Sequence, residues 1–415
     1  MNCNPWTKAL VGAGLISLPA VALAEEKASS VLTALSSTTL SGYVDTSAQW
    51  NFGTGNARLP DYKFGGSSKA DGFNLDVVQL RIEKPLDEGE WAAGYRVDLW
   101  AGPDANILNT QSIFGSGSGS RASAGDFAIR QAYVALRAPC GNGIDFKVGV
   151  FDTIIGYESV ESGNNPNYTR SYGHSIEPQT HTGILASYRF NEMISASVGV
   201  ANTIGPAIND RAQGPNGGTV DGLSNWTKAE SYKTYMASVA VTAPENMGCC
   251  LSGSTLYAGI VNGFSDSYGD GQTSYYIGST LATPVTGLRL GASFDYLDIH
   301  NLGGESWSVA GYASYKACEK LWLHVRGEYL RDRGEQKFFS YYDSVSGSLV
   351  DTNPDRVLAL TATAQYDLWK NVISRLELRW DHSLSGHKTW GGDDNSPNPT
   401  RLNEWMLAAN VIYKF

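Results

Sequence analysis

The chain ends with the stretch Trp405-Met406-Leu407-Ala408-Ala409-Asn410-Val411-Ile412-Tyr413-Lys414-Phe415. Every second side chain in it, counted from Trp405 to Phe415, is apolar or aromatic. Alternation with a period of two places these side chains on one face of a β-strand and turns that face toward an apolar medium. Aromatic residues at both ends of the face indicate a medium with two watery interfaces, as a bilayer has. A soluble β-sandwich can also end in an alternating strand, so this stretch alone does not decide between the two.

The start of the chain indicates export. Lys8 precedes a run of apolar and small residues over 9–24, which ends in Ala-Leu-Ala at 22–24. A charged n-region, an apolar h-region and a small-x-small site are the parts of a signal peptide, so we expect residues 1–24 to be cleaved. The mature chain would then start at Glu25. An uncleaved membrane anchor is the alternative, but the run is short for a spanning helix.

The composition excludes several classes of protein. The formal net charge is −10 and no stretch forms a clustered basic footprint, which argues against nucleic acid as a partner. The chain is rich in Gly, Tyr and Trp, as expected for a barrel with a wet lumen and a single apolar face. Cys3 would leave with the signal peptide, and the remaining cysteines are too few for a disulfide scaffold: Cys140, Cys249, Cys250 and Cys318.

Alternating segments recur along the chain, and the connections between them are short and long in turn. We expect sixteen strands, near 39–52, 74–84, 90–101, 126–138, 144–152, 179–190, 194–204, 232–243, 254–264, 272–283, 288–299, 306–317, 321–334, 354–368, 372–384 and 401–415. Two loops, 153–178 and 205–231, could each contain a further hairpin, which leaves the count open by two strands.

This pattern predicts an all-β fold, a transmembrane antiparallel β-barrel over residues 38–415 with short periplasmic turns and long extracellular loops. Residues 25–37 would form a short periplasmic segment before it. No water in hydrocarbon can satisfy the amides of a sheet edge, so the strand that ends at Phe415 must pair with the strand at 39–52. We expect Tyr413 and Phe415 to serve barrel closure and assembly. A soluble all-β protein is the alternative.

Ionisable residues recur on the face that is expected to point inward, most clearly in Arg375-Leu376-Glu377-Leu378-Arg379-Trp380-Asp381. A charge on the lipid face costs several kcal/mol near the bilayer midplane, whereas a wet lumen tolerates it. The candidate pore-lining residues on the strands are Arg81, Arg96, Arg130, Lys147, Arg326, Arg375, Glu377, Arg379 and Asp381. They either form an eyelet that orients solutes or a ladder of cross-strand ion pairs that contributes little.

The loop 153–178 mixes apolar and aromatic residues with acids, so we expect it to pack against the barrel interior. The region around it is similar to a known family. The stretches Val148-Gly149-Val150-Phe151-Asp152-Thr153, Gly156-Tyr157-Glu158, Asn165-Pro166-Asn167-Tyr168-Thr169-Arg170-Ser171-Tyr172-Gly173, Ile176-Glu177-Pro178, His181-Thr182-Gly183 and Ser41-Gly42-Tyr43-Val44-Asp45 resemble the OmpL-like β-barrel porins. The resemblance implies a porin, and it supplies neither an agreed solute nor catalytic residues.

By analogy with trimeric porins in general, an inward-folded third loop would set acids against basic residues of the wall. We therefore treat 153–178 as the candidate constriction loop. Its acids Glu158 and Glu161 are expected to lie opposite some of three arginines, Arg81, Arg96 and Arg130.

No catalytic or metal-binding constellation stands out. The six histidines are scattered without a nucleophile motif, and Asp381-His382 is the nearest catalytic candidate. No spacing typical of a metal site appears. The cysteines of the mature chain fall in or beside predicted turns on one side of the barrel, too far apart for a bridge unless a turn folds under the rim. A vicinal bridge, links to a partner and free thiols stay open.

The sequence thus predicts a porin of the bacterial outer membrane that lets small hydrophilic solutes and ions diffuse passively, without a cofactor or enzymatic turnover. Its expected partners are outer-membrane lipid, these solutes and ions, like subunits in a homo-oligomer (a trimer), and the barrel-assembly machinery through the C-terminal strand. The alternatives are a substrate-selective channel, and a structural or adhesive barrel that does not conduct.

Overall fold

The computed structural model describes residues 37–415 except 54, 66, 111–125, 213–217, 221–222, 226–231, 245–246, 249–250, 265–270, 301–303, 334–340, 343–348, 351–354 and 394–398. The predicted signal peptide and nearly all of the segment 25–37 lie outside the described residues, as do Cys249 and Cys250.

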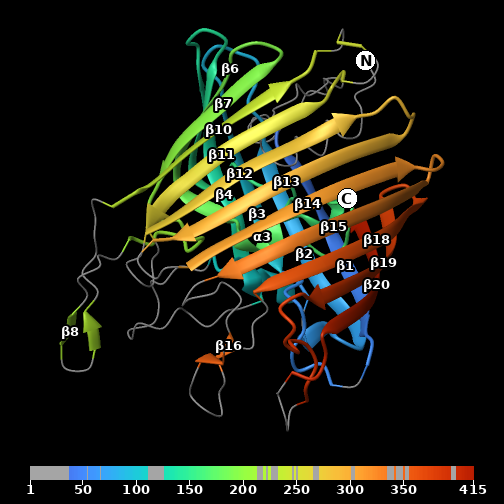
Figure 1. The fold of residues 1–415 in the computed structure, drawn as a ribbon. Coiled ribbons are helices and arrows are strands. Elements are labelled where there is room, and N and C mark those ends of the chain that lie inside the picture. The colour runs from blue at the N-terminus through green and yellow to red at the C-terminus, as the bar shows by residue number, and fades with distance from the viewer. Residues whose placement is uncertain are drawn as a thin grey trace.

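Within the described residues, sixteen strands form one closed antiparallel barrel (Figure 1). They are β1 (Thr39–Asn51), β2 (Gly72–Lys84), β3 (Ala93–Ala101), β4 (Phe127–Ala138), β5 (Ile144–Asp152), β6 (Thr180–Arg189), β7 (Ile194–Ala201), β10 (Thr234–Thr242), β11 (Thr255–Phe264), β12 (Gly271–Ala282), β13 (Leu288–Ile299), β14 (Gly304–Lys316), β15 (Leu321–Arg333), β18 (Arg356–Trp369), β19 (Val372–Ser383) and β20 (Asn403–Lys414). The predicted barrel and its count of sixteen are confirmed, and each strand overlaps its predicted range.

The barrel closes between β1 and β20. Val44 pairs with Tyr413 and Asn51 pairs with Met406, so the last strand runs antiparallel to the first as predicted. Gly42 and Phe415 exchange two backbone hydrogen bonds of 3.0 Å. A Cβ on Gly42 would overlap the carbonyl oxygen of Gln79 on β2 and would lie 2.7 Å from the ring carbon Cζ of Phe415, so this glycine leaves space for both. The seam therefore depends on both residues.

Two small hairpins lie outside the barrel. One joins β8 (Gly218–Val220) to β9 (Leu223–Asn225), and the other joins β16 (Tyr341–Tyr342) to β17 (Leu349–Val350). The loop 205–231 thus contains the extra hairpin that the sequence left open, but the barrel count is unchanged because this hairpin forms a sheet of its own.

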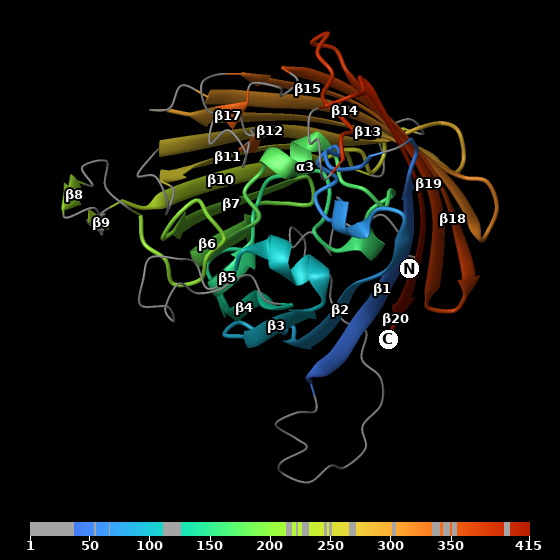
Figure 2. The same ribbon diagram turned by 90° about the horizontal axis from the view of Figure 1, so that it is seen from below.

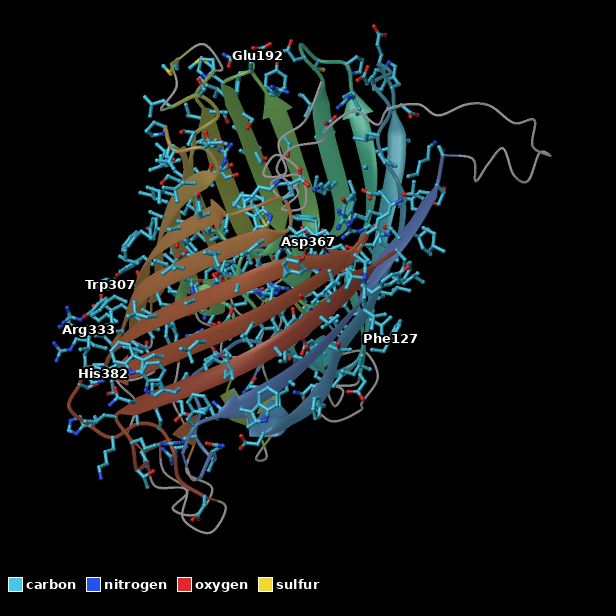
Figure 3. All side chains as sticks on the ribbon, turned by 90° about the vertical axis from the view of Figure 1, so that its right-hand side faces the viewer. Phe127, Glu192, Trp307, Arg333, Asp367 and His382 are labelled. Atoms are coloured by element: carbon cyan, nitrogen blue, oxygen red, sulfur yellow. The ribbon has the colours of Figure 1, made fainter. Side chains whose placement is uncertain are left out.

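Alternate residues of each strand face the lumen and the outside. On β19, Leu376 and Leu378 are 53% and 41% exposed, whereas Arg379, the residue directly after Leu378, is fully buried. Figure 3 shows Trp307, Arg333 and His382 on the outside of the barrel, toward the end opposite Glu192. The predicted division into an apolar outer face and a charged inner face is therefore present in the fold.

The short turns lie at one end of the barrel, which we call the turn end. Cys140 and Cys318 are in turns at this end, and both are exposed free thiols. The 3₁₀ helices η1 (Ser67–Lys69) and η2 (Pro103–Leu108) belong to the loops of the other end. No helix among the described residues is both long enough and apolar enough to cross a membrane.

Candidate pore constriction

The loop 153–178 folds into the barrel, and most of its residues are buried there (Figure 2). It contains the 3₁₀ helix η3 (Ser162–Asn164) and the short helix α3 (Tyr172–Ile176). Ser171 caps α3, because its hydroxyl accepts a hydrogen bond from the amide of His174 at 3.1 Å. The packing inside the barrel that the sequence predicted for this loop is present.

Glu161 of the loop lies against three arginines of the wall. Its Oε1 is 3.3 Å from Arg96 and 3.3 Å from Arg130, and it also pairs with Arg81. The three arginines come from inward positions of β2, β3 and β4, which are neighbouring strands. The expected arrangement of Glu161 opposite Arg81, Arg96 and Arg130 is what the structure has.

The same arginines also bind Asp98 of β3. Asp98 is fully buried and lies 2.8 Å from Arg81, 2.8 Å from Arg96 and 2.7 Å from Arg130. Burial alone disfavours the charged form of Glu161, but the arginines outweigh it and hold the pKa of this carboxyl below its usual value. The charges of this wall are thus largely neutralised by one another.

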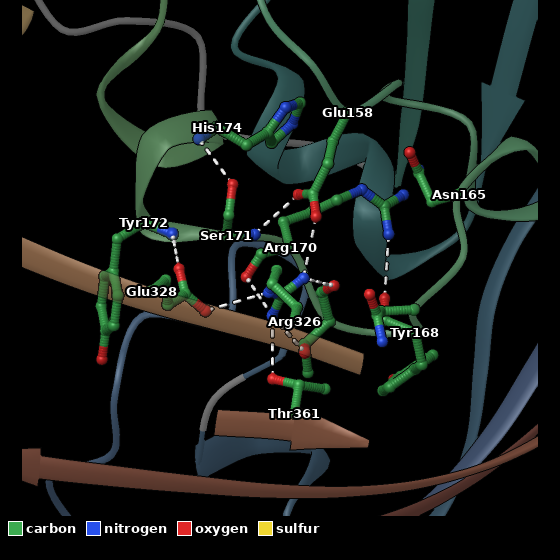
Figure 4. A network of polar contacts seen from close by, with 12 residues as sticks. Glu158, Asn165, Tyr168, Arg170, Ser171, Tyr172, His174, Arg326, Glu328 and Thr361 are labelled. Atoms are coloured by element: carbon green, nitrogen blue, oxygen red, sulfur yellow. Dashed lines mark hydrogen bonds and ion pairs between the residues drawn. The ribbon is translucent and has the colours of Figure 1, made fainter. Parts of the chain in front are cut away.

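Glu158 lies elsewhere than the sequence suggested. Its Oε1 accepts from Nη1 of Arg326 on β15 at 2.8 Å, and its Oε2 accepts from the amide of Ser171 at 2.6 Å (Figure 4). The expectation that Glu158 faces the arginines of β2 to β4 is wrong. The loop turns between Glu158 and Glu161, so the two acids reach different parts of the wall.

Charged residues of β15 bind the loop backbone. Arg326 donates to the carbonyl oxygens of Thr169 at 2.8 Å and Arg170 at 3.2 Å, and Glu328 accepts from the amide of Tyr172 at 2.6 Å. Figure 4 shows these contacts around Arg326. Since a charged partner strengthens a hydrogen bond, these contacts fix the path of the loop firmly.

Charged residues of β19 do the same. Arg375 donates to the carbonyls of Asn167 at 2.8 Å and Ser162 at 3.1 Å, while Glu377 accepts from the amide of Tyr168 at 2.6 Å. Further along β19, Arg379 donates to the carbonyl of Arg170 at 2.8 Å, and Asp381 accepts from the hydroxyl of Tyr172 at 2.8 Å. The candidate residues of β15 and β19 therefore hold the loop in place.

Arg170 connects the two arms of the loop from inside. Its guanidinium donates to the carbonyls of Ser159 at 3.0 Å, Val160 at 2.7 Å and Tyr168 at 2.9 Å. It also lies over the ring of Phe64, 5.3 Å from the ring centre. Arg170 was not among the residues predicted from the sequence, although it belongs to the stretch that carries the family resemblance.

The loop also reaches the remaining wall through apolar contacts. Ile154 and Ile155 pack in one cluster with Leu185 of β6, Met236 of β10 and Tyr257 of β11. On the next part of the wall, the ring of Tyr157 stacks on Tyr312 of β14, with ring centres 4.0 Å apart. The loop thus touches inward side chains on nearly every side of the barrel.

A cavity of about 1580 Å³ lies between the loop and the turn end. Four of the candidate residues line it: Arg81, Arg96, Lys147 and Glu161. Lys147 lies over the ring of Tyr133, with its Nζ 5.1 Å from the ring centre. The other candidate pore-lining residues do not line this cavity. They make the contacts with the loop and the wall described above.

The two sides of this cavity differ in charge. Its acids, lysines and arginines come from the strands β2 to β6, from the turns that follow β2 and β6, from the loop 153–178 and from β20. In the described part of the wall from β7 to β12, no lining residue is an acid, a lysine, an arginine or a histidine. Hydroxyl groups line that side instead, among them Ser197, Ser238 and Thr280. This uncharged side was missed, because Ser and Thr at alternate positions carry no distinctive sequence signal.

The nearest catalytic candidate is not assembled. Asp381 points inward to Arg379 and Tyr172, whereas the ring of His382 bonds to Asn403 on the exposed side, as adjacent positions of a strand require. Among the described residues, no group of three or more His, Cys, Asp or Glu is arranged to hold a metal ion.

A closed barrel of sixteen strands with a loop folded into a polar lumen defines an outer-membrane channel. The chain belongs to the family described as putative beta-barrel porin-2, OmpL-like, whose model matches residues 37–415. Among curated protein sequences there is no significant match.

Several solved porins share the fold. OprB of Pseudomonas putida is 12% identical, with a TM-score of 0.56 over 93% of this chain and 96% of its own. OmpF of Salmonella typhi, in complex with daunomycin, is 13% identical, with a TM-score of 0.53 over 91% and 97%. An anion-selective porin from Comamonas acidovorans is 12% identical, with a TM-score of 0.52 over 91% and 99%. At these identities, the likeness concerns the fold alone.

Proposed function

We propose that this porin of the bacterial outer membrane lets small hydrophilic solutes and ions diffuse passively through a lumen that the loop 153–178 narrows. The observation that carries the proposal is the position of the loop inside the barrel, beside a cavity that charged and hydroxyl side chains help to line and that reaches the turn end. The turn end would face the periplasm, as short turns do in outer-membrane barrels. Passage would depend on width and lining charge, without a cofactor or turnover.

The lining supports a modest preference for anions. The lysines and arginines that line the cavity are Arg81, Lys84, Arg96, Arg137, Lys147, Arg189 and Lys414. The acids that line it are Glu83, Glu88, Asp145, Glu161 and Glu192. Seven cations against five anions leave a surplus of two positive charges. Six of these residues stand in ion pairs, namely Arg81, Glu83, Arg96, Arg137, Asp145 and Glu161, so strong selectivity for one solute is not expected.

Conductance of the purified protein in planar bilayers tests the proposal. We expect stable single-channel steps whose size increases with the salt concentration, and a reversal potential in a salt gradient that indicates weak anion preference. A barrel that inserts but never conducts would contradict the proposal and favour the structural or adhesive alternative. A steep block by one solute class would favour a substrate-selective channel.

We further infer the partners of the barrel. The outward apolar side chains, with Trp307 toward the end opposite Glu192, suit contact with outer-membrane lipid. Association into a homo-oligomer, with a trimer expected, and recognition of Tyr413 and Phe415 by the barrel-assembly machinery belong to the same proposal. Mass measurement of the detergent-solubilised protein would report the number of subunits, and a monomer at all concentrations would contradict the trimer.

A further inference from the structure

Two arginines lie side by side on the outside of the barrel. Arg331 on β15 and Arg356 on β18 are direct partners in the antiparallel register. Both point outward, because the adjacent residues Leu330 and Val357 are buried on the inner face. Residues directly opposite each other in an antiparallel pair share one face, with Cβ atoms about 5 Å apart. Two positive charges therefore meet here, an arrangement that destabilises a sheet unless an anion lies between them.

The nearby acids do not neutralise this arginine pair. Within the part of the chain that the structure describes, neither guanidinium has an ion-pair or hydrogen-bond partner. Asp332 is buried and accepts a hydrogen bond from the hydroxyl of Ser306. Glu305 of β14 pairs with Arg333 at 3.4 Å, and Asp355 has an interaction of its own. The pair is thus a site of positive charge that a further anion can occupy.

Below the arginine pair, toward the middle of the barrel, the outward face is aromatic and apolar. Trp307 of β14 is the register partner of Arg331, and its ring centre is 5.3 Å from that of Tyr329. Val309 on β14 and Leu360 on β18 are 45% and 49% exposed. An arginine stem can lie along such a surface while its charged group reaches a polar layer. The patch is therefore amphipathic, cationic at its rim and apolar below.

The patch lies at the end of the barrel that carries the long loops. The two arginines flank the loop 334–355, and Figure 3 shows Arg333 and Trp307 on the outside, toward the end opposite Glu192. Aromatic side chains on the outer face of such barrels mark the interface between hydrocarbon and lipid headgroups. The arginines beside Trp307 therefore stand at headgroup level. The orientation of the proposed function turns this end toward the outer leaflet.

We propose that Arg331 and Arg356 hold the phosphate of a lipid of the outer leaflet, whose acyl chains lie along Tyr329, Val309 and Leu360. Each guanidinium offers a planar set of N–H donors that matches a phosphate group. A bound phosphate attracts both arginines and so offsets the repulsion between them. A free phosphate would leave the apolar side chains below uncovered, so the patch favours a lipid. The choice of leaflet rests on the proposed function, whereas the contact itself does not.

Thermal unfolding of the detergent-solubilised protein tests the lipid site, since a ligand of the folded state raises the melting temperature. The probes are diphosphorylated lipid A, the same lipid without its phosphates, and inorganic phosphate at the same phosphate concentration. We expect only the diphosphorylated lipid to raise the melting temperature of the wild type, by several degrees. The double variant Arg331→Gln/Arg356→Gln should lose this rise and still fold, because it also removes the repulsion between the two charges.

The matched control is Lys316→Gln/Lys320→Gln, which removes two exposed positive charges where β14 turns into β15, at the turn end. It should keep the full rise. Arg331→Lys/Arg356→Lys keeps the charge but loses the planar donors, so it should keep part of the rise. If the double glutamine variant does not fold, Arg356→Gln alone changes an exposed side chain and should show a reduced rise.

An equal rise in the wild type and the folded glutamine variant would overturn the lipid site. An equal rise with the dephosphorylated lipid would overturn the role of the phosphate, and an equal rise with inorganic phosphate would overturn the assignment to a lipid. The measurement needs no conductance. A wild type that never conducts would therefore contradict the porin proposal, while the melting temperatures still decide the lipid site.

Discussion

Nη1 of Arg375 on β19 lies 2.8 Å from the carbonyl oxygen of Asn167 in the loop, and both residues are buried. The contact joins the barrel wall to a segment more than two hundred residues earlier in the chain. Similar contacts from Arg326 and Arg379 mean that wall charges hold the loop across the lumen. Under the proposed function, these buried contacts would set the width of the passage.

Removal of one of these anchors should destabilise the loop. Arg326 is fully buried and bonds Glu158, Glu328 and the loop backbone, so Arg326→Ala leaves buried groups without their partner. The expected cost is about 3–5 kcal/mol, measured as the free energy of unfolding in detergent. Arg331→Ala, on the outward face of the same strand, is the control and should cost less than about 1 kcal/mol. Equal costs would contradict the anchoring role.

The two loop acids should differ in their effect on ion selectivity. Glu161 lines the cavity among three arginines, so Glu161→Gln removes a negative charge there and should increase the preference for anions. Glu158→Gln should change the reversal potential less, because Glu158 bonds Arg326 away from the cavity. Reversal potentials in a salt gradient measure both. An equal shift in the two variants would show that the assignment of Glu161 to the passage is wrong.

The contact of Glu161 with the wall should weaken in acid. Its lowered pKa means that it stabilises the fold above the unfolded-state value of about 4.3, and that this contribution is lost as the pH falls through the folded-state pKa. The difference in thermal stability between the wild type and Glu161→Gln should therefore be largest near neutral pH and shrink in strongly acidic solution. A difference that stays constant down to the acid limit would contradict the ion pairing.

The seam between Gly42 and Phe415 should affect assembly before it affects conductance. Deletion of Phe415 removes the backbone bonds to Gly42, and Gly42→Val places side-chain atoms against the Phe415 ring and the carbonyl of Gln79 on β2. We expect both changes to reduce the fraction of folded barrel in the outer membrane, while the barrels that do fold keep the wild-type conductance. Normal amounts of folded protein with altered conductance would be the opposite result.

The fold could be predicted because period-two alternation decides which side of each strand meets lipid. The run from Arg375 to Asp381 alternates charge with apolar side chains, and the structure turns the two sets to opposite faces. Strand ends were less certain: β3 begins at Ala93, three residues after the predicted start at Glu90. The sequence did not decide whether the loop 205–231 contains a hairpin, since a short strand has the same local pattern inside or outside a barrel.

The site could be predicted only in part, because a loop has no repeating period. Glu161 was expected to face Arg81, Arg96 and Arg130, and it does, whereas Glu158 bonds Arg326. The direction of each acid depends on the path of the backbone, which Arg170 and the wall arginines fix through carbonyl groups. Backbone carbonyls are present in every residue, so the sequence does not indicate which of them accept a hydrogen bond from an arginine.

The conductance of a chain whose loop anchors are absent tests the central claim, that the loop 153–178 narrows the lumen. Residues 157–172 would be replaced by a Gly-Ser linker of the same length, which keeps the connection but removes the contacts with Arg326, Arg375 and Arg379. If the loop sets the width, the single-channel conductance of this variant should exceed that of the wild type under the same salt. An equal conductance from a correctly folded variant would contradict the account.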